Sequence, residues 1–314
     1  MLRTDRPTTL PVDVASELRD ALARRQKELP PRWLAAGDAL ALRERGDAPG
    51  HAREAIERDL AIAITRQRLT SNPPRGVVCI QASASRATRA VVDALCAGGS
   101  ISSIIATELE HSLATEMLHR VRPTDVAGAA VACDATVDLP LPPTLPRPRV
   151  YVCLGNTLGR STAVAAVRML RVMRTTMMPG DTILLGLDVG GVKSAIDTSS
   201  DAIARADRHL AALELVKTTT GATLDVSRFD FRPSYDPDNR RVETHLVARR
   251  GFAVEIPGVG DVRFRKGESI RTSVSCVFDR SRVSAMLTGV GLALREWTTD
   301  DAGTYVVALA APAT

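Results

Sequence analysis

The sequence predicts an α/β protein with a doubly wound parallel sheet and an inserted α+β domain. Between residues 76 and 187, short apolar strands alternate with amphipathic helices, which is the pattern of consecutive βαβ units. After residue 190 the alternation stops, and one long helix is followed by clustered strands. A chain of 314 residues is long enough for about two domains, each with its own core.

The part of the chain before the first parallel strand is expected to be helical. Apolar residues at helical spacing predict one helix over 14–28, before the prolines at 30 and 31. A second predicted helix covers 52–69 and ends before Asn72-Pro73-Pro74. We therefore expect residues 1–75 to form an N-terminal helical segment.

The next block, residues 76–190, is expected to form most of the sheet domain. Its predicted elements are strands at 77–80, 101–106, 126–133, 150–154 and 182–187, and helices at 85–97, 110–121 and 162–177. Residues 278–314 are expected to return to this sheet as a helix and an antiparallel hairpin. The predicted turn of that hairpin is at residues 299–301.

The intervening residues, 191–277, are expected to form the inserted substrate-binding domain. A helix over about 196–217 precedes strands predicted at 242–249, 252–256, 262–265 and 270–277. A helix followed by a run of strands is typical of a separate α+β unit.

Arginine dominates the basic residues of this chain. The formal net charge is +5, and only four of the 41 basic residues are lysines. Guanidinium groups bind carboxylate, phosphate or sulfate in a bidentate manner, which favours an anionic substrate or an acidic partner such as a carrier protein. The alternative is a codon bias toward arginine and alanine. Nucleic acid is not expected, because 2 Trp, 3 Tyr and 5 Phe offer little surface for base stacking.

The cysteines and the hydropathy pattern predict a cytoplasmic protein. Five cysteines form no CxxC pair, and their odd number disfavours a disulfide framework. No apolar run is long enough to cross a membrane, and the first residues lack the apolar region of a signal peptide. The five histidines show no metal-ligand spacing, so no metal site is expected.

Five short segments occur in an order and spacing that resemble one enzyme family. They are LPPRW at 29–33, VCLGNTLG at 152–159, MPGDTILLG at 178–186, SVSCVF at 273–278 and WTTD at 297–300. Together they resemble the histidine-specific S-adenosylmethionine methyltransferase family, whose best-known member trimethylates the α-amino group of histidine. The resemblance covers about residues 25–310. It implies a Rossmann-like class I methyltransferase fold with an inserted α+β substrate domain.

The resemblance also locates the cofactor turn, and here the sequence departs from the family. The family's turn after the first strand reads LGSGTSEKT, and its glycines let the backbone approach the cofactor. In this chain Gln81 and Ser83 replace the two glycines, and Ala87 replaces the lysine. We therefore expect S-adenosylmethionine to bind weakly or not at all. The alternative is a turn that is merely widened.

Two acidic residues are candidates for the remaining cofactor contacts that the resemblance implies. The family's ribose-binding aspartate falls on Thr107, and Glu108 follows it directly. Asp134, after the third strand, matches an acid that binds the adenine amine. The alternatives are an ordinary strand-end carboxylate for Glu108 and a turn cap for Asp134.

The amino-acid pocket implied by the resemblance is altered too. The family's substrate-binding asparagine, in LGSTIGN, falls on Arg160, its tyrosine on Ile196 and its imidazole-binding glutamate on Ser273. Ser275 is retained, and Asn156 of the same LGNTLG segment is a further substrate-binding candidate. Because arginine repels a cationic amine and attracts anions, free histidine is not expected as the substrate. The alternative is an Arg160 that points outward.

Three functions are compatible with these replacements. We favour an enzyme of amino-acid-derived secondary metabolism that no longer transfers methyl groups and uses no cofactor. In it, Arg160 would be catalytic and stabilise an anionic leaving group, as in a sulfate-eliminating ring closure that forms an aziridine. The first alternative is an S-adenosylmethionine-dependent N-methyltransferase acting on an amino acid other than histidine. The second is a non-catalytic partner subunit of a biosynthetic complex.

Overall fold

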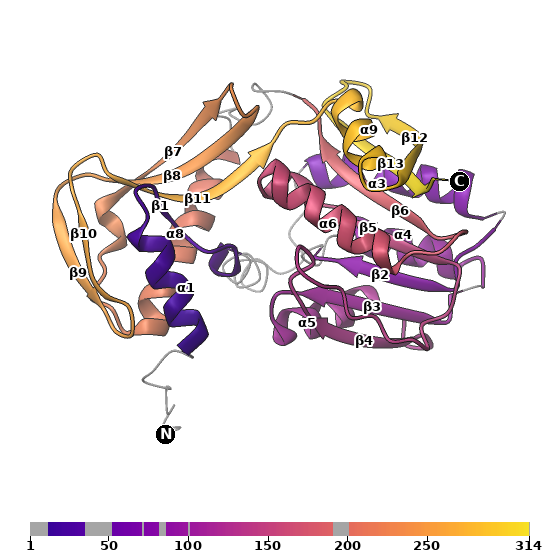
Figure 1. Ribbon diagram of the computed structural model, residues 1–314, viewed down its shortest axis with the longest axis horizontal. Helices are drawn as coiled ribbons and strands as arrows, with labels where there is room; N and C mark the ends of the chain where they lie inside the picture. The colour runs from indigo at the N-terminus through magenta and orange to yellow at the C-terminus, as the bar shows by residue number, and fades with distance from the viewer. Residues whose placement is uncertain are drawn as a thin grey trace. The chain divides into compact units, whose positions relative to one another are not determined.

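The computed structural model describes residues 12–34, 52–70, 72–81, 86–99, 101–190 and 201–313, in two compact units (Figure 1). The first unit comprises residues 1–46, 196–238 and 242–274, and the second comprises 47–195, 239–241 and 275–314. The segment expected at 1–75 is therefore divided between the two units. The reason is a long-range pairing, in which residues 27 and 28 pair in parallel with residues 270 and 271. The predicted helix at 14–28 ends earlier, as α1 (Val12–Ala23), and its last residues form the short strand β1 (Lys27–Glu28).

The second unit contains a seven-stranded sheet with the order β12-β13-β6-β5-β2-β3-β4. Strands β2 to β6 are mutually parallel, and β13 and β12 are added antiparallel at one edge. This is the strand order of a class I methyltransferase fold, as expected. The strands are β2 (Gly76–Ile80), β3 (Ser103–Glu108), β4 (Ala127–Ala132), β5 (Arg149–Cys153), β6 (Thr182–Asp188), β12 (Leu292–Thr299) and β13 (Tyr305–Pro312).

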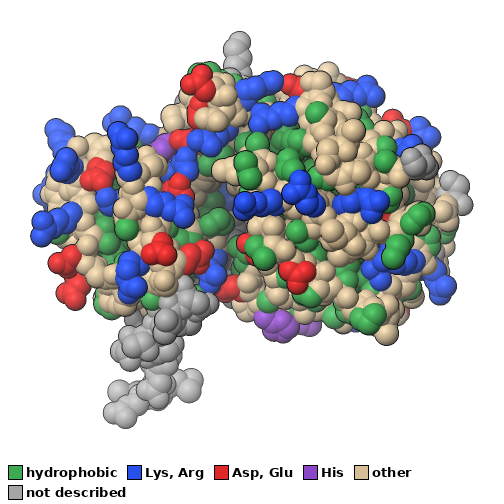
Figure 2. Space-filling view, in the orientation of Figure 1, with side chains coloured by type: hydrophobic (Ala, Val, Ile, Leu, Met, Phe, Trp, Pro, Cys, Tyr) green, Lys and Arg blue, Asp and Glu red, His purple; other side chains and the backbone are tan. Residues whose placement is uncertain are grey.

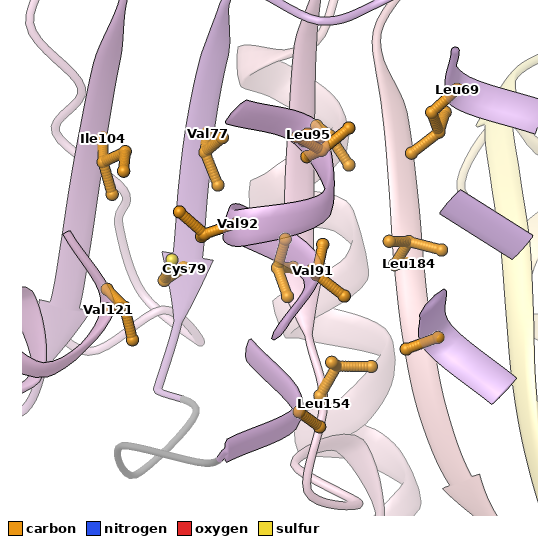
Figure 3. Close-up of a cluster of buried hydrophobic side chains, with 14 of the residues drawn as sticks. Leu69, Val77, Cys79, Val91, Val92, Leu95, Ile104, Val121, Leu154 and Leu184 are labelled. Carbon is orange, nitrogen blue, oxygen red and sulfur yellow. The ribbon is translucent and has the colours of Figure 1, made fainter. Parts of the chain in front are cut away.

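Helices cover both faces of this sheet, and Figure 1 shows α6 on one face and α4 on the other. The central strands β2 and β5 are buried at every position, and apart from Arg149 at the start of β5 their sequences are continuously apolar, as expected for such strands. Figure 3 shows Val91, Val92 and Leu95 of α4 packed toward Val77 and Cys79 of β2. The helices are α3 (Ala52–Ile64), which continues as a π-helical turn (Thr65–Leu69), α4 (Arg86–Cys96), α5 (His111–Val121), α6 (Ala163–Thr176) and α9 (Arg280–Thr288).

The first unit pairs a four-stranded sheet, in the order β1-β11-β8-β7, with helices α1 and α8 (Asp201–Thr220). Its core includes three phenylalanines, Phe229, Phe252 and Phe264, with neighbouring ring centroids 5.0–5.5 Å apart. The strands are β7 (Phe229–Asp236), β8 (Arg241–Ala248), β11 (Ser269–Cys276) and the separate hairpin β9 (Phe252–Ile256) with β10 (Gly260–Phe264). The sequence patterns did not predict β7, which contains Pro233 and lies at the sheet edge, where proline is tolerated.

Many of the arginines are paired locally. Figure 2 shows basic and acidic side chains interspersed over the face in view. Several pairs are one helical turn apart, such as Arg89 with Asp93 and Arg120 with Glu116, the spacing at which opposite charges support a helix. Among the described helices, none combines the length and the apolar character that a membrane crossing requires.

Candidate functional site

The candidate site lies in the second unit, where the chain leaves the carboxyl end of β5. Gly155 and Asn156 both adopt left-handed backbone conformations, with φ of 72° and 53°, and a short 3-10 helix (Leu158–Arg160) follows. Asparagine is one of the few residues other than glycine that adopt this conformation readily. Gly159 is needed here, because a side chain at that position would overlap the amide of Asn156. The LGNTLGR segment therefore forms a tightly folded loop at the edge where open α/β sheets bind ligands.

Two of the predicted substrate residues meet in this loop. The Nδ2 of Asn156 donates to Ser275 Oγ at 3.3 Å, and Asn156 Oδ1 accepts from the backbone N–H of Asp188 at 3.1 Å. Asn156 is buried. Its amide links the β5 loop to Asp188 at the end of β6 and to Ser275, which also belongs to the second unit. Asn156 thus orders the site through these contacts.

A buried carboxylate that the sequence patterns missed supports the same loop. Glu57, from α3, has 3% of its surface exposed. Its Oε1 accepts hydrogen bonds from the backbone N–H of Gly155 at 2.6 Å and from the Tyr305 hydroxyl at 2.5 Å. Burial raises the pKa of Glu57, and the two hydrogen bonds and the positive charge of Arg160 oppose that rise. A sequence signal existed: Glu57 lies four and seven residues before the buried Ala61 and Ile64, on the core face of the helix.

The first turns of α3 also contact two neighbouring segments at the same sheet edge. Arg53 Nη1 lies 2.6 Å from Oδ2 of Asp188, the last residue of β6. Burial raises the pKa of Asp188, and the charge of Arg53 opposes the rise. Glu54 Oε1 accepts from the backbone N–H of Arg86 at 2.8 Å, at the start of α4. One helix therefore holds the start of α4, the β5 loop and the end of β6.

Arg160 is exposed at the end of the 3-10 helix. Its guanidinium lies on the Gly155 side of the loop, since its Nη2 is 3.6 Å from where a Gly155 Cβ would be. Its charge lowers the pKa of both Glu57 and Cys153 against the dominant effect of burial. Because this cation is exposed and has a carboxylate within its electrostatic reach, it does not require a bound anion to offset burial.

The turn after β2 keeps a glycine-like geometry without glycine. Gln81 has a φ of 41°, in the left-handed region. Its backbone N–H donates to the carbonyl of Thr107 at 3.0 Å, and its carbonyl accepts from Thr157 Oγ1 at 3.3 Å. Its side-chain Nε2 lies 3.4 Å from the carbonyl of Cys133. Ser83 and Ile196 fall outside the described residues.

The two acidic candidates for the cofactor have different surroundings. Glu108 is the last residue of β3 and is 5% exposed, so a buried carboxylate stands at the strand end where ribose hydroxyls are bound in related folds. Asp134 is exposed, and its Oδ1 accepts from the backbone N–H and the hydroxyl of Thr136 at 2.8 and 2.7 Å, so it caps a turn. The left-handed turn at Gln81 and the carboxylate of Glu108 fit a ribose-containing cofactor.

Ser273 belongs to the first unit, on β11. Side chains alternate along a strand, so Ser273 shares a face with Arg271. The guanidinium of Arg271 pairs with Glu28 and, at 2.6 Å, with Glu243 of β8. His245 Nε2 lies 3.2 Å from the same Glu243. The face of the sheet that carries Ser273 is therefore lined by charged groups of both signs.

Comparison with known proteins identifies the family. A family model described as "Histidine-specific methyltransferase, SAM-dependent" matches residues 14–312. A histidine N-alpha-methyltransferase of Mycobacterium tuberculosis is 27% identical over 304 residues, covering 94% of each chain. Another, of Mycolicibacterium smegmatis, is 32% identical over 167 residues, about half of each chain (52% and 51%). The structure of the CcbJ methyltransferase from Streptomyces caelestis is similar with a TM-score of 0.49 and 16% identity, over 85% of this chain and 94% of that one.

These matches correct two expectations drawn from the altered motifs. An enzyme that has abandoned methyl transfer and uses no cofactor is the wrong prediction, since the family is SAM-dependent and its model spans nearly the whole chain. A ring-closing elimination at Arg160 has no support in the matches. The error has a physical reason. The loss of glycine after β2 was read as the loss of the cofactor turn, whereas the backbone of Gln81 retains the left-handed conformation. This chain belongs to the histidine-specific, S-adenosylmethionine-dependent methyltransferase family.

Proposed function

We propose that this protein is an S-adenosylmethionine-dependent N-methyltransferase whose substrate is an amino acid other than histidine. The observation that carries the proposal is the ordered loop after β5, in which Arg160 stands where the family has its substrate-binding asparagine. The family match supports methyl transfer, and the replacement of the binding residue supports a changed substrate.

The residues that would hold the cofactor lie at the ends of neighbouring parallel strands. The backbone turn at Gln81 and the buried carboxylate of Glu108 would hold S-adenosylmethionine, with Asp134 beside them after β4. When bound, this cofactor supplies an activated methyl group on a sulfonium. The residues of the chain bind and orient the acceptor amine, so their contribution is positioning.

The substrate end of the site favours an acceptor with a carboxylate. Arg160 is permanently charged and presents a planar fork of donors that matches a carboxylate. Ser273 replaces the glutamate that the family uses for imidazole, which removes the acceptor for a histidine side chain. Ser275 remains, hydrogen-bonded to Asn156.

Two measurements test this function. Calorimetric titration of the protein with S-adenosylmethionine and S-adenosylhomocysteine is expected to show binding of both. Incubation with S-adenosylmethionine and a panel of standard amino acids, read by mass spectrometry, is expected to show methylation of an amino acid other than histidine. Failure of both ligands to bind would overturn the methyltransferase assignment, and methylation of histidine alone would overturn the substrate assignment.

A further inference from the structure

Glu57 is a buried acid, and the contacts described above do not require its negative charge. Removing a carboxylate from water is costly, and the raised pKa of Glu57 reports that cost. Its two described hydrogen bonds, from Gly155 and Tyr305, both reach Oε1. A glutamine could accept the same two bonds through its own carbonyl oxygen and would avoid the cost of the charge. Hydrogen bonding alone therefore does not explain why the residue is an acid.

The surrounding fold is shaped to place this carboxylate. Gly186, in the middle of β6, has no side chain, and a methyl group there would overlap Glu57 Oε1. Gly155, whose N–H binds Glu57, has a φ of 72° that favours glycine. Two separate strands thus leave room for the same oxygen atom, and the phenol of Tyr305 reaches it from a third.

The carboxylate of Glu57, from α3, contacts the loop that carries Arg160, and the two side chains have opposite charges. Both side chains lie against Gly155, whose N–H binds Glu57 Oε1 and whose added Cβ would lie 3.6 Å from Arg160 Nη2, and the positive charge of Arg160 lowers the pKa of Glu57. Their charges sum to about zero. The free head group of an amino acid is also a zwitterion, with one ammonium and one carboxylate. An isolated arginine at this place would repel the ammonium, whereas an arginine balanced by a carboxylate tolerates it.

We propose that Glu57 is a specificity-determining positioning residue. Its buried carboxylate fixes the loop at residues 154–160 and balances Arg160, so that the pair selects a zwitterionic amino-acid head group over a simple carboxylate. This inference rests on the proposed function for the identity of the substrate, but the charge selection can be measured without methyl transfer.

The decisive variant is Glu57→Gln, which keeps the hydrogen-bond acceptor and removes the charge. We expect it to fold with undiminished stability at neutral pH and to bind S-adenosylmethionine as the parent does. Its KM for the methylated amino acid should rise about tenfold, equivalent to about 1.4 kcal/mol, with kcat nearly unchanged. In an Arg160→Gln background the same change should have little effect on KM, because the two charges act as a pair. The matched control is Asp59→Asn, an exposed acid on the same helix.

A binding measurement keeps the inference separate from the proposed function. L-Alanine and propionate share the α-carboxylate and the methyl group, and only alanine carries the ammonium. By saturation-transfer NMR, the parent should bind alanine at least as well as propionate, and Glu57→Gln should shift the preference toward propionate. An unchanged preference and KM in the folded variant would refute the role of Glu57, as would failure of the parent to bind either probe. Absence of methyl transfer together with the expected shift would refute only the proposed function.

Discussion

The hydroxyl of Tyr305, on β13, donates a 2.5 Å hydrogen bond to Oε1 of Glu57, 248 positions earlier in the chain. The same hydroxyl accepts from the backbone N–H of Asn156 at 3.2 Å. Tyr305 is fully buried, and burial raises the pKa of its phenol well above the ordinary value, with the nearby Glu57 charge adding to the rise. The phenol therefore stays protonated and connects the helix before the sheet, the β5 loop and the last strand.

Tyr305→Phe should destabilise the protein. The change removes one donor from the buried Glu57 carboxylate and the acceptor of the Asn156 N–H. Loss of a hydrogen bond to a buried charged group costs about 1.5–3 kcal/mol. Urea unfolding measures the change, and Tyr235→Phe, at a half-buried position on β7, is the control with an expected change below about 0.5 kcal/mol. Equal effects of both substitutions would contradict the assignment.

Gly186→Ala should be destabilising through two identifiable contacts. The added methyl would overlap Glu57 Oε1 and lie 2.8 Å from the Tyr305 hydroxyl, and overpacking of this kind costs about 1–3 kcal/mol. Combined with Glu57→Ala, which removes the nearer of these two oxygens, the two costs should be clearly less than additive. Gly251→Ala is the control, because its added methyl would lie 3.6 Å from the nearest atom. Simple additivity in the double variant would show that the overlap is not the cause.

Gln81→Gly should strengthen cofactor binding several-fold without loss of stability. Holding Gln81, which has a Cβ, in the left-handed region costs about 1–2 kcal/mol, and glycine avoids this cost. The gain offsets the stability lost because glycine is more flexible in the unfolded chain. Glycine also lets the backbone approach a ligand more closely. Calorimetric titration with S-adenosylhomocysteine measures the effect. Gln81→Ala keeps the Cβ and should show no such gain, so equal behaviour of the two variants would count against the backbone explanation.

The stability difference between the parent and Glu57→Gln should depend on pH. Burial raises the folded-state pKa of Glu57 above its ordinary value of 4.5, so the folded protein holds this proton more tightly than the unfolded chain. The resulting stabilisation is complete below the unfolded value and is lost as pH rises through the folded pKa. Relative to the variant, the parent should therefore lose stability from about pH 4.5 upward. Urea unfolding at a series of pH values measures this, and a constant difference would contradict it. Asp188, whose pKa is also raised, is present in both proteins and cancels.

Restoring the family's residues should restore activity toward histidine. Arg160→Asn removes the cation at the β5 loop, and Ser273→Glu supplies a carboxylate for the imidazole. We expect the double variant to raise kcat/KM for histidine at least about tenfold, about 1.4 kcal/mol of transition-state binding. Arg168→Asn, an exposed arginine on α6, is the control for the loss of a charge. If histidine turnover stays at the parent's level, these two positions do not set the substrate.

The sheet was predictable from the sequence because its strands and helices are locally encoded. Buried parallel strands such as Val150 to Cys153 are continuously apolar, and prolines and glycines mark where they end. The exact helix ends were less predictable. Residues 24–28 are all residue types that favour a helix, but Lys27 and Glu28 pair with β11, a contact more than 240 residues away. Local patterns contain no information about such pairing.

The site was only partly predictable for the same reason. Asn156 and Ser275 were expected from motifs and do meet. Glu57 and Tyr305 were not expected, because each is an ordinary residue of its element and acquires its role only when distant segments come together. The opposite error concerned Gln81, where the residue type suggested a lost turn and the backbone retained it.

The parallel pairing of β1 with β11 means that the first unit is assembled from separate stretches of chain. Leu18 and Leu22 of α1 contribute to the same core as Phe229 and Leu246. A fragment of residues 196–274 alone would therefore lack the side chains that α1 contributes to this core. Chimeras that exchange the first unit between relatives must therefore transplant the stretch around 12–34 together with residues 196–274.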